Sequence, residues 1–441
     1  MEISLRKPFP RLIALLISLP VAGVIFFAAG KIGVADALNR SADPLNWLRA
    51  AQIEPGYGEY WRHLGRYRQY DLDNADPILA AEYYDKAVRA DPRSSRYWMD
   101  IAISYEQNNQ PAMANQAYQQ ALAYYPISAE VKWNYGNFLL RRQQISAGIA
   151  QLHQAIVIDT KLRPLAISRC WQSDPDVNVL LDSLLPAQPD AYLDALDFMA
   201  ATRNLPAGLK IWDRLLALKQ PFPMDSTFSF FDAMIQAGQT DEGRRMWRQA
   251  YDANGLPYDT PPDHSAIWNG GFEHDLLNGG FGWRIFGITG VLVQPDTTIF
   301  HTGKRSMRVD FGGGVNADFF HLFQFVAVQP NQKYHFRGWL RTHNITTDSG
   351  VRFYLGDPES SGEVRLLTPS VTGTTPWTRV EADIETGPST HALVLQVRRL
   401  PSRAFESRID GTAWVDDVSL VPVAGSSLSA ASSDNTGEES R

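Results

Sequence analysis

The longest hydrophobic run lies near the amino terminus, where residues 12–30 (LIALLISLPVAGVIFFAAG) contain no charged side chain. A helix needs about 20 apolar residues to cross a bilayer, so this segment is predicted to be a transmembrane helix. Arg6, Lys7 and Arg11 precede it, and a basic flank stays on the cytoplasmic side of a membrane. Residues 1–37 are therefore predicted to be a cytoplasmic start and a single-pass anchor in a bacterial inner membrane, with the bulk of the chain in the periplasm.

A second interpretation of this segment is a cleaved signal peptide. The tripeptide Ala35-Asp36-Ala37 has the small-x-small form of a signal-peptidase site. The apolar run is longer than the ~7–15 residues of a signal-peptide core, which favours the uncleaved anchor.

From residue 41 to residue 258 the apolar positions recur with the period of amphipathic helices. A shift of the chain by 34 residues against itself pairs Pro92 with Pro126 and Ala121 with Ala155. A repeat of this length is typical of stacked helical hairpins, because one hairpin alone cannot bury its apolar face. We therefore expect residues 41–258 to form one α-helical solenoid of about six helix pairs.

The clearest repeat is RYWMDIAISYEQNNQPAMANQAYQQALAYYP, in which large and small residues alternate at fixed positions. These positions are Trp98, Ile101, Ala102, Tyr105, Ala114, Tyr118, Ala121 and Pro126. They resemble the tetratricopeptide repeat, and the units before and after resemble it less closely. The resemblance implies a curved surface that binds a protein partner and supplies no catalytic groups.

Short alternating runs replace the helical pattern in residues 266–423. The runs are SMRVDF, HLFQFVAV, YHFRGWLRT, VRFYLG, WTRVEADI, ALVLQVRR and AWVDDVSLVPV. Separated by glycine, proline or asparagine, they predict an all-β sandwich. We expect a linker over residues 259–265 and, because the tail AGSSLSAASSDNTGEESR is of low complexity, a disordered segment over residues 424–441.

Two motifs mark the ends of this β region, Asn269-Gly270-Gly271-Phe272-Glu273 and Trp414-Val415-Asp416-Asp417-Val418-Ser419-Leu420. With Trp283, Gln324 and Trp377 between them, they resemble the jelly-roll carbohydrate-binding modules of families four, nine and twenty-two. The chain is thus predicted to be multidomain, with a transmembrane helix, a tetratricopeptide-like solenoid and a carboxyl-terminal jelly-roll sandwich.

The resemblance also implies a structural metal site in the stretch NGGFEHDLLNGGFGW. In such modules a glutamate and an aspartate hold calcium, and the matching residues here are Glu273 and Asp416. Carboxylates and glycine-flanked carbonyls are the hard oxygen ligands that calcium prefers. In the alternative, Glu273 only accepts hydrogen bonds from turn amides. We also expect Phe272, Phe281 and Trp283 to fix this segment to the sandwich core.

Sugar recognition needs exposed aromatic rings beside polar groups. Alternation along YHFRGWLRT places Trp339 and Arg341 on one face of a strand, and VRFYLG places Arg352 and Tyr354 on one face of another. These four residues are predicted to form one polysaccharide-binding patch, provided that the two strands are neighbours. In the alternative, Trp339 packs beneath a loop.

Composition and motifs exclude several other functions. A net charge of −7 without a basic run makes nucleic acid an unsuitable partner. The single cysteine, Cys170, excludes internal disulfides and cysteine-cluster metal sites. No metalloprotease, P-loop, dinucleotide-binding or nucleophile-elbow motif is present in the sequence, so we expect no enzyme activity.

Two functions fit these features. The first is a non-catalytic glycan-binding adaptor whose solenoid docks a partner of exopolysaccharide or cell-envelope polysaccharide assembly. The second is an envelope scaffold that joins proteins and whose sandwich binds no sugar.

Overall fold

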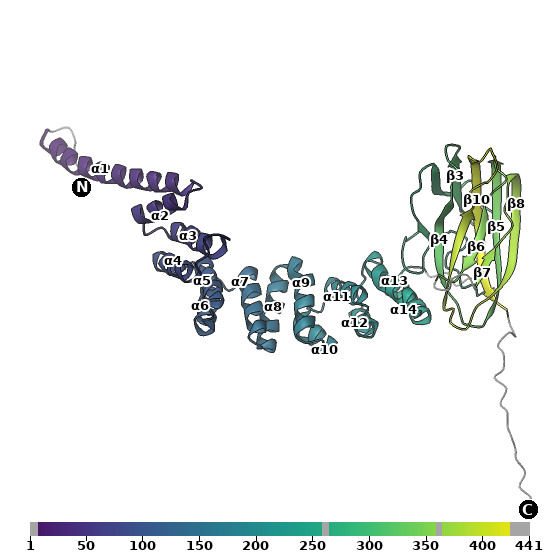
Figure 1. The fold of residues 1–441 in the computed structure, drawn as a ribbon, viewed down its shortest axis with the longest axis horizontal. Helices are drawn as coiled ribbons and strands as arrows, with labels where there is room; N and C mark the ends of the chain where they lie inside the picture. The colour runs from purple at the N-terminus through teal and green to yellow at the C-terminus, as the bar shows by residue number, and fades with distance from the viewer. Residues whose placement is uncertain (1–7, 258–263, 359–363, 424–441) are drawn as a thin grey trace, which may run out of the picture. The chain divides into compact units, whose positions relative to one another are not determined.

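The computed structural model describes residues 8–257, 264–358 and 364–423 (Figure 1). The chain divides into two compact units. The first unit is Met1–Pro186 and the second is Ala187–Arg441. Most of the predicted linker and all of the predicted tail lie outside the described residues. The helices of the first unit are α1 (Pro8–Asn39), α2 (Pro44–Ile53), α3 (Gly58–Tyr70), α4 (Pro77–Ala90), α5 (Ser95–Gln107), α6 (Pro111–Tyr124), α7 (Ala129–Arg141), α8 (Ile145–Ile158), η1 (Thr160–Leu162), α9 (Arg163–Ser173), α10 (Val177–Val179) and η2 (Leu180–Leu184).

Helix α1 contains the apolar run, and its portion Leu15–Asn39 is long and apolar enough to cross a membrane. The last turns of the same helix belong to the packed part of the unit. Ala35 is 0% exposed and lies in one core cluster with Ala50 and Ala51 of α2. The membrane-length helix therefore continues without a break into the first helical hairpin.

The hairpins α3–α4, α5–α6 and α7–α8 follow the predicted repeat. Helices α5 and α7 begin 34 residues apart, at Ser95 and Ala129. Their starts are set by the caps Ser94 and Ser128, whose hydroxyls accept backbone N–H bonds of the first turn. The small residues predicted at the hairpin contacts are buried, among them Ala102, Ala114 and Ala121. The predicted tetratricopeptide-like array of hairpins is confirmed for this part of the chain.

The helices of the predicted range continue beyond α8 and across the division between the two units. The division between Pro186 and Ala187 falls inside residues 41–258. It follows η2, a π-helical turn, and Pro189 then begins α11 in the first turn, where proline is well accommodated. The helices beyond the division are α11 (Pro189–Ala201), α12 (Leu205–Ala217), η3 (Asp225–Thr227), α13 (Phe228–Gln236) and α14 (Thr240–Ala253).

The β region is a sandwich of two antiparallel five-stranded sheets. Sheet A has the order β1-β4-β9-β6-β7 and sheet B the order β2-β3-β10-β5-β8. Their strands are β1 (Arg284–Ile285), β2 (Val291–Asp296), β3 (Ser306–Gly312), β4 (Phe319–Ala327), β5 (Lys333–Ile345), β6 (Arg352–Gly356), β7 (Arg365–Leu367), β8 (Gly373–Glu385), β9 (Ala392–Arg399) and β10 (Asp410–Pro422). The seven alternating runs all form strands, and the sequence pattern missed only the short strands β1 and β7 and the strand β2.

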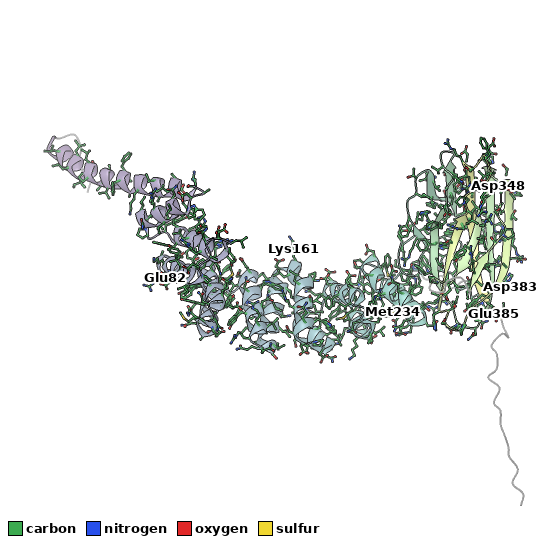
Figure 2. The ribbon with its side chains drawn as sticks, viewed as in Figure 1. Glu82, Lys161, Met234, Asp348, Asp383 and Glu385 are labelled. Atoms are coloured by element: carbon green, nitrogen blue, oxygen red, sulfur yellow. The ribbon has the colours of Figure 1, made fainter. Side chains whose placement is uncertain are left out.

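The edge strand β8 carries exposed carboxylates, including Asp383 and Glu385 (Figure 2). Charged side chains on an edge strand oppose pairing with a strand of another molecule. The sandwich therefore presents an acidic edge at this side of sheet B.

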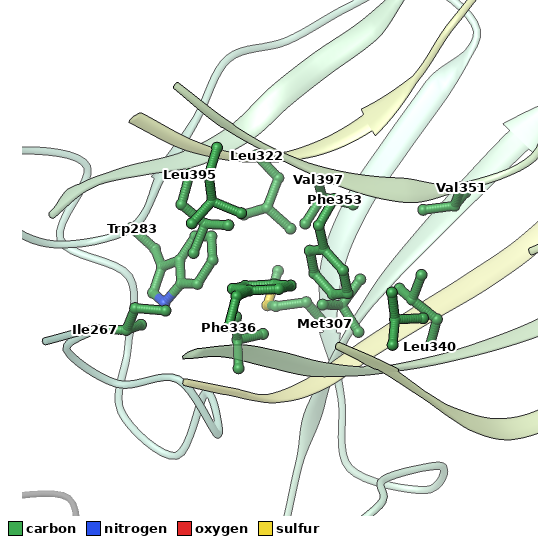
Figure 3. Packing of buried hydrophobic residues seen from close by; sticks show 14 of the residues in the cluster. Ile267, Trp283, Met307, Leu322, Phe336, Leu340, Val351, Phe353, Leu395 and Val397 are labelled. Carbon is green, nitrogen blue, oxygen red and sulfur yellow. The ribbon is translucent and has the colours of Figure 1, made fainter. Parts of the chain in front are cut away.

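The two sheets meet in one continuous hydrophobic core (Figure 3). Phe336 of β5 and Phe353 of β6 meet edge to face, with ring centroids 5.0 Å apart. Gly338 allows this approach, because a Cβ added there would lie 2.6 Å from the Phe353 ring. The buried and outward residues of β5 and β6 alternate as predicted.

Helices α13 and α14 pack directly against the start of the β region. Trp247 of α14 contacts Phe281, with ring centroids 6.2 Å apart. Arg284 of β1 forms an ion pair with Asp232 of α13, and Thr240 Oγ1 donates to the backbone carbonyl of His391 at 2.6 Å. The last helices and the sandwich thus form one packed unit.

This packing corrects one expectation for the glycine-rich stretch. Phe272 and Trp283 lie in the sandwich core as predicted, whereas Phe281 lies against the helices instead. The stretch contains two Asn-Gly-Gly-Phe sequences, and only the phenylalanine of the first one packs in the sandwich core. The second covers the aromatic side chains that α13 and α14 present.

Candidate functional site

The four residues predicted to form one ligand patch lie on two different sheets. Trp339 and Arg341 point outward from β5, and Arg352 and Tyr354 point outward from β6. Strand β5 pairs with β8 and β10, whereas β6 pairs with β7 and β9, so the hydrophobic core separates the two pairs. The prediction of a single patch is therefore wrong, although each residue lies on the outward side of its strand.

Trp339 lies beneath the loop that follows β2. The ring of His301 stacks on the indole, with centroids 3.8 Å apart and planes at 20°. Asp417 holds this imidazole, because His301 Nδ1 lies 2.5 Å from the Asp417 carboxylate. Arg341 lies against another ring, with its guanidinium carbon 5.7 Å from the centroid of Trp414. This arrangement matches the alternative interpretation, in which Trp339 packs under a loop.

The two predicted calcium ligands are both satisfied by backbone amides. Asp416 is 0% exposed, and one of its oxygens accepts from the amide of His301 at 2.7 Å. Glu273 accepts from the amide of Lys304 at 2.9 Å. Burial, and then the neighbouring charge of Asp417, raise the pKa of Asp416 to about 7, against the lowering effect of the amide bonds. The Asp416 carboxylate is thus held in a site that disfavours its negative charge.

A glycine lies among these carboxylates. A Cβ added at Gly271 would lie 3.7 Å from Asp417 Oδ1, 4.0 Å from Asp416 Oδ1 and 3.8 Å from Glu273 Cγ. In the described ranges, no group of three or more His, Cys, Asp or Glu side chains is placed to hold a metal ion. Calcium would therefore take Glu273 and Asp416 and find its other ligands among backbone carbonyls, which suits its preference for oxygen. Calcium binding stays a prediction.

The outer face of sheet A carries a shallow depression of about 550 Å³. Tyr354 lines it together with Phe320, which is 41% exposed, and with polar side chains from strands β7 and β9. The polar side chains that line the depression include Arg365 of β7 and Gln396 and Arg398 of β9. One of the four predicted binding residues, Tyr354, therefore lies at a site that combines aromatic rings with hydrogen-bonding groups.

The Tyr354 ring lies along its own strand over Gly356. A Cβ added at Gly356 would overlap the hydroxyl end of this ring. The missing side chain lets the hydroxyl end of the ring lie close to the backbone. Gly356 is thus a positioning residue for Tyr354.

Sequence reasoning missed Phe320, Arg365, Gln396 and Arg398. Alternation in ALVLQVRR was a sufficient signal for Gln396 and Arg398, since it places them on the outward face of β9. No local pattern shows that β9 lies beside β6, because that pairing joins segments about 40 residues apart, as in Tyr354 with Gln396.

The first unit has a second depression, of about 460 Å³, beside α2 and α3. Its lining is mainly aromatic, and Trp47 meets Tyr67 edge to face with centroids 5.7 Å apart. The lining residues are Trp47, His63, Arg66, Tyr67, Tyr70 and Asp71.

No protein-family model and no curated protein matches the chain. Solved structures that align with part of it include one from the functional characterisation of Pseudomonas aeruginosa pilF, at 19% identity and a TM-score of 0.26, covering 44% of this chain and 91% of that chain. The MamA protein aligns at 16% identity and a TM-score of 0.24, covering 45% and 92% of the two chains. YrrB, described as a TPR protein with an unusual peptide-binding site, aligns at 12% identity and a TM-score of 0.25, covering 47% and 92%. At these scores the likeness adds nothing to the fold described above.

Proposed function

We propose that the chain is a non-catalytic adaptor that is anchored in a bacterial inner membrane, faces the periplasm and binds a polysaccharide through its sandwich. The observation that carries this proposal is the depression on sheet A, where Tyr354 and Phe320 lie beside Arg365, Gln396 and Arg398. An aromatic face stacks on the apolar face of a pyranose, and neighbouring polar groups fix its hydroxyls. The site is open and shallow, which suits an extended chain of sugars.

The membrane anchor gains support from the position of Ala35. Cleavage after Ala37 would remove Ala35, which is fully buried against α2. It would also remove Lys31, whose ammonium lies 3.4 Å from the Glu54 carboxylate. In a cleaved chain, α2 would lose the part of α1 that covers it, and its apolar side chains would be exposed. This favours an uncleaved anchor.

The hairpins α3–α8 are proposed to dock a protein of exopolysaccharide or cell-envelope polysaccharide assembly. Stacked hairpins offer an extended surface, and the first unit has an aromatic depression beside α2 and α3. Because α1 leads directly into these helices, the docking surface stays close to the membrane.

Affinity electrophoresis tests the proposal directly. The detergent-solubilised full chain is run through native gels that contain the envelope polysaccharides of the source organism. Wild-type protein is expected to be retarded, and Tyr354→Ala is expected to lose most of the retardation. Tyr124→Ala removes a half-exposed tyrosine from α6 and is the matched control, which is expected to run like wild type.

The scaffold interpretation predicts a different result. If no envelope polysaccharide retards the wild-type chain, the sandwich binds no sugar and joins proteins instead. Capture of membrane-associated partners by the full chain, undiminished by Tyr354→Ala, would then favour the scaffold.

A further inference from the structure

Two guanidinium groups face each other on the outer side of sheet A. Arg352 of β6 is paired in register with Arg398 of β9. Like charges directly opposite on neighbouring strands repel each other and destabilise the pair. A negative charge between or beside the two guanidinium groups would offset this repulsion.

Among the described residues, a carboxylate pairs with one of these two guanidinium groups and not with the other. Arg398 forms an ion pair of 2.8 Å with Asp318. Arg352 has no ion pair within the described ranges, and its Nε is buried without a hydrogen-bond partner there. Desolvation by burial lowers the pKa of the Arg352 guanidinium, in line with the missing partner.

A third guanidinium lies on the same face. The Arg365 carbon is 5.8 Å from the centroid of the Tyr354 ring, and Arg398 lies 5.1 Å over Phe320 in the same way. Among the described residues, Arg365 has no carboxylate partner. The nearby carboxylate of Asp357 accepts a hydrogen bond from Thr390 Oγ1 at 2.6 Å. Each aromatic ring of the depression therefore has a cation beside it.

On sheet B, several charged side chains have partners of opposite charge within the protein. Arg379 of β8 pairs with Glu381, Arg308 of β3 pairs with Asp310 at 2.8 Å, and His335 contacts Asp383 at 2.7 Å. Arg341 of β5 is the exception among these described side chains, because it lies over the Trp414 ring without an ion pair in the described ranges. Among the described residues of the sheet A face, Arg352 and Arg365 are thus two guanidinium groups without a carboxylate partner.

We infer that the ligand of this face is an acidic polysaccharide whose carboxylates are bound by Arg352 and Arg365 while a sugar ring stacks on Tyr354. The inference rests on the proposed function and specifies the class of glycan. A guanidinium binds a carboxylate through two parallel N–H bonds, and these charge-assisted bonds are stronger than bonds to neutral hydroxyls. Neutral glycans leave both cations unpaired.

Polygalacturonate, alginate and hyaluronan are the test polymers, each compared with a form whose carboxyl groups have been reduced to alcohols. The detergent-solubilised full chain is expected to bind at least one acidic polymer about tenfold or more tightly than its reduced form, because charged hydrogen bonds are lost. Added salt is expected to weaken binding of the acidic form and to leave binding of the reduced form nearly unchanged.

Arg352→Gln and Arg365→Gln are expected to abolish the preference for the acidic form. Arg379→Gln removes a guanidinium from sheet B and is the control that is expected to keep it. Equal binding of acidic and reduced polymers would overturn the inference and leave the polysaccharide adaptor intact. Absence of binding to every polymer, together with unretarded migration through envelope polysaccharides, would overturn both.

Discussion

The indole of Trp247 lies on the backbone of Gly280, where an added Cβ would overlap a ring carbon. Gly280 also has a φ of +53°, a conformation that side chains of L-residues rarely adopt. One residue belongs to the last helix and the other to the segment that opens the sandwich. The contact explains why this segment is rich in glycine and shows how the helices and the sandwich are joined.

Gly280→Ala is therefore expected to destabilise the second unit by roughly 2–4 kcal/mol, since overpacking and backbone strain act together. Urea unfolding of the full chain, followed by tryptophan fluorescence, measures the change. Gly287→Ala is the control, because a Cβ there meets nothing within 4 Å and Gly287 has no positive φ. Equal stability of the two variants would show that the Trp247 contact does not join the two parts.

A second prediction concerns the small residues of the helical hairpins. Ala114 of α6 is fully buried, whereas Ala112 of the same helix is exposed. Ala114→Trp is expected to destabilise the first unit by about 1–3 kcal/mol by overpacking, and Ala112→Trp to change it little. Thermal unfolding followed by circular dichroism compares them, and similar midpoints would contradict the hairpin packing.

A third prediction concerns the state of the amino terminus in cells. The burial of Ala35 in the first hairpin predicts that the mature protein keeps α1 and sediments with membranes. Mass spectrometry of the purified protein is expected to find peptides from residues before Ala35. A soluble form that begins near Leu38 would show that the segment is a cleaved signal peptide.

The buried carboxylate of Asp416 predicts a dependence of stability on pH. Its pKa is raised to about 7 in the folded chain, whereas an aspartate in an unfolded chain has a pKa of about 3.9. The folded state therefore binds more protons between about pH 4 and pH 7, so the free energy of unfolding falls as pH rises, by at most about 1.4 kcal/mol per pH unit. The stabilising contribution is fully present at low pH and lost above about pH 7.

Asp416→Asn is expected to flatten this pH dependence, and urea unfolding at about pH 5 and about pH 8 measures it. Asp275→Asn removes a carboxylate that is 95% exposed and is expected to keep the wild-type dependence. An unchanged slope in Asp416→Asn would assign the dependence to other groups.

A bound calcium ion would change the stability that the Asp416 carboxylate contributes. An ion bound by Glu273 and Asp416 stabilises only the folded state, so chelation is expected to lower the melting temperature. Because the ion compensates the buried charge, the loss is expected to be larger above pH 7 than below it. The melting temperature of the double variant Glu273→Gln, Asp416→Asn is expected not to change with chelator or calcium. If the melting temperature of the wild-type chain also stays unchanged with both, the two carboxylates only accept hydrogen bonds from turn amides.

Local sequence patterns predicted the features that depend on neighbours along the chain. Alternation placed Tyr354 and Trp339 outward from their strands, and the 34-residue spacing located helices α5 to α8. These features depend on the two-residue period of a strand and on hairpin length, both of which a single segment carries.

The composition of the site depends on contacts between distant segments, which local patterns do not contain. Strands β5 and β6 are consecutive in the chain and yet lie in different sheets, so Trp339 and Tyr354 are separated by the core. Likewise, nothing near Phe281 indicates that it packs against Trp247 of a helix. Strand pairing and the packing of helices on the sandwich decide which side chains meet.

The central claim is that sheet A, and not sheet B, is the polysaccharide-binding face. Isothermal titration of the detergent-solubilised full chain with the envelope polysaccharide that retards it most strongly tests this claim, with Tyr354→Ala and Trp339→Ala compared at matched folding. A stacked ring contributes roughly 1–2 kcal/mol to binding, so Tyr354→Ala is expected to weaken binding by about five- to thirtyfold. Trp339 lies under the loop that carries His301, so Trp339→Ala is expected to bind like wild type. Binding that is lost in Trp339→Ala and retained in Tyr354→Ala would contradict the account.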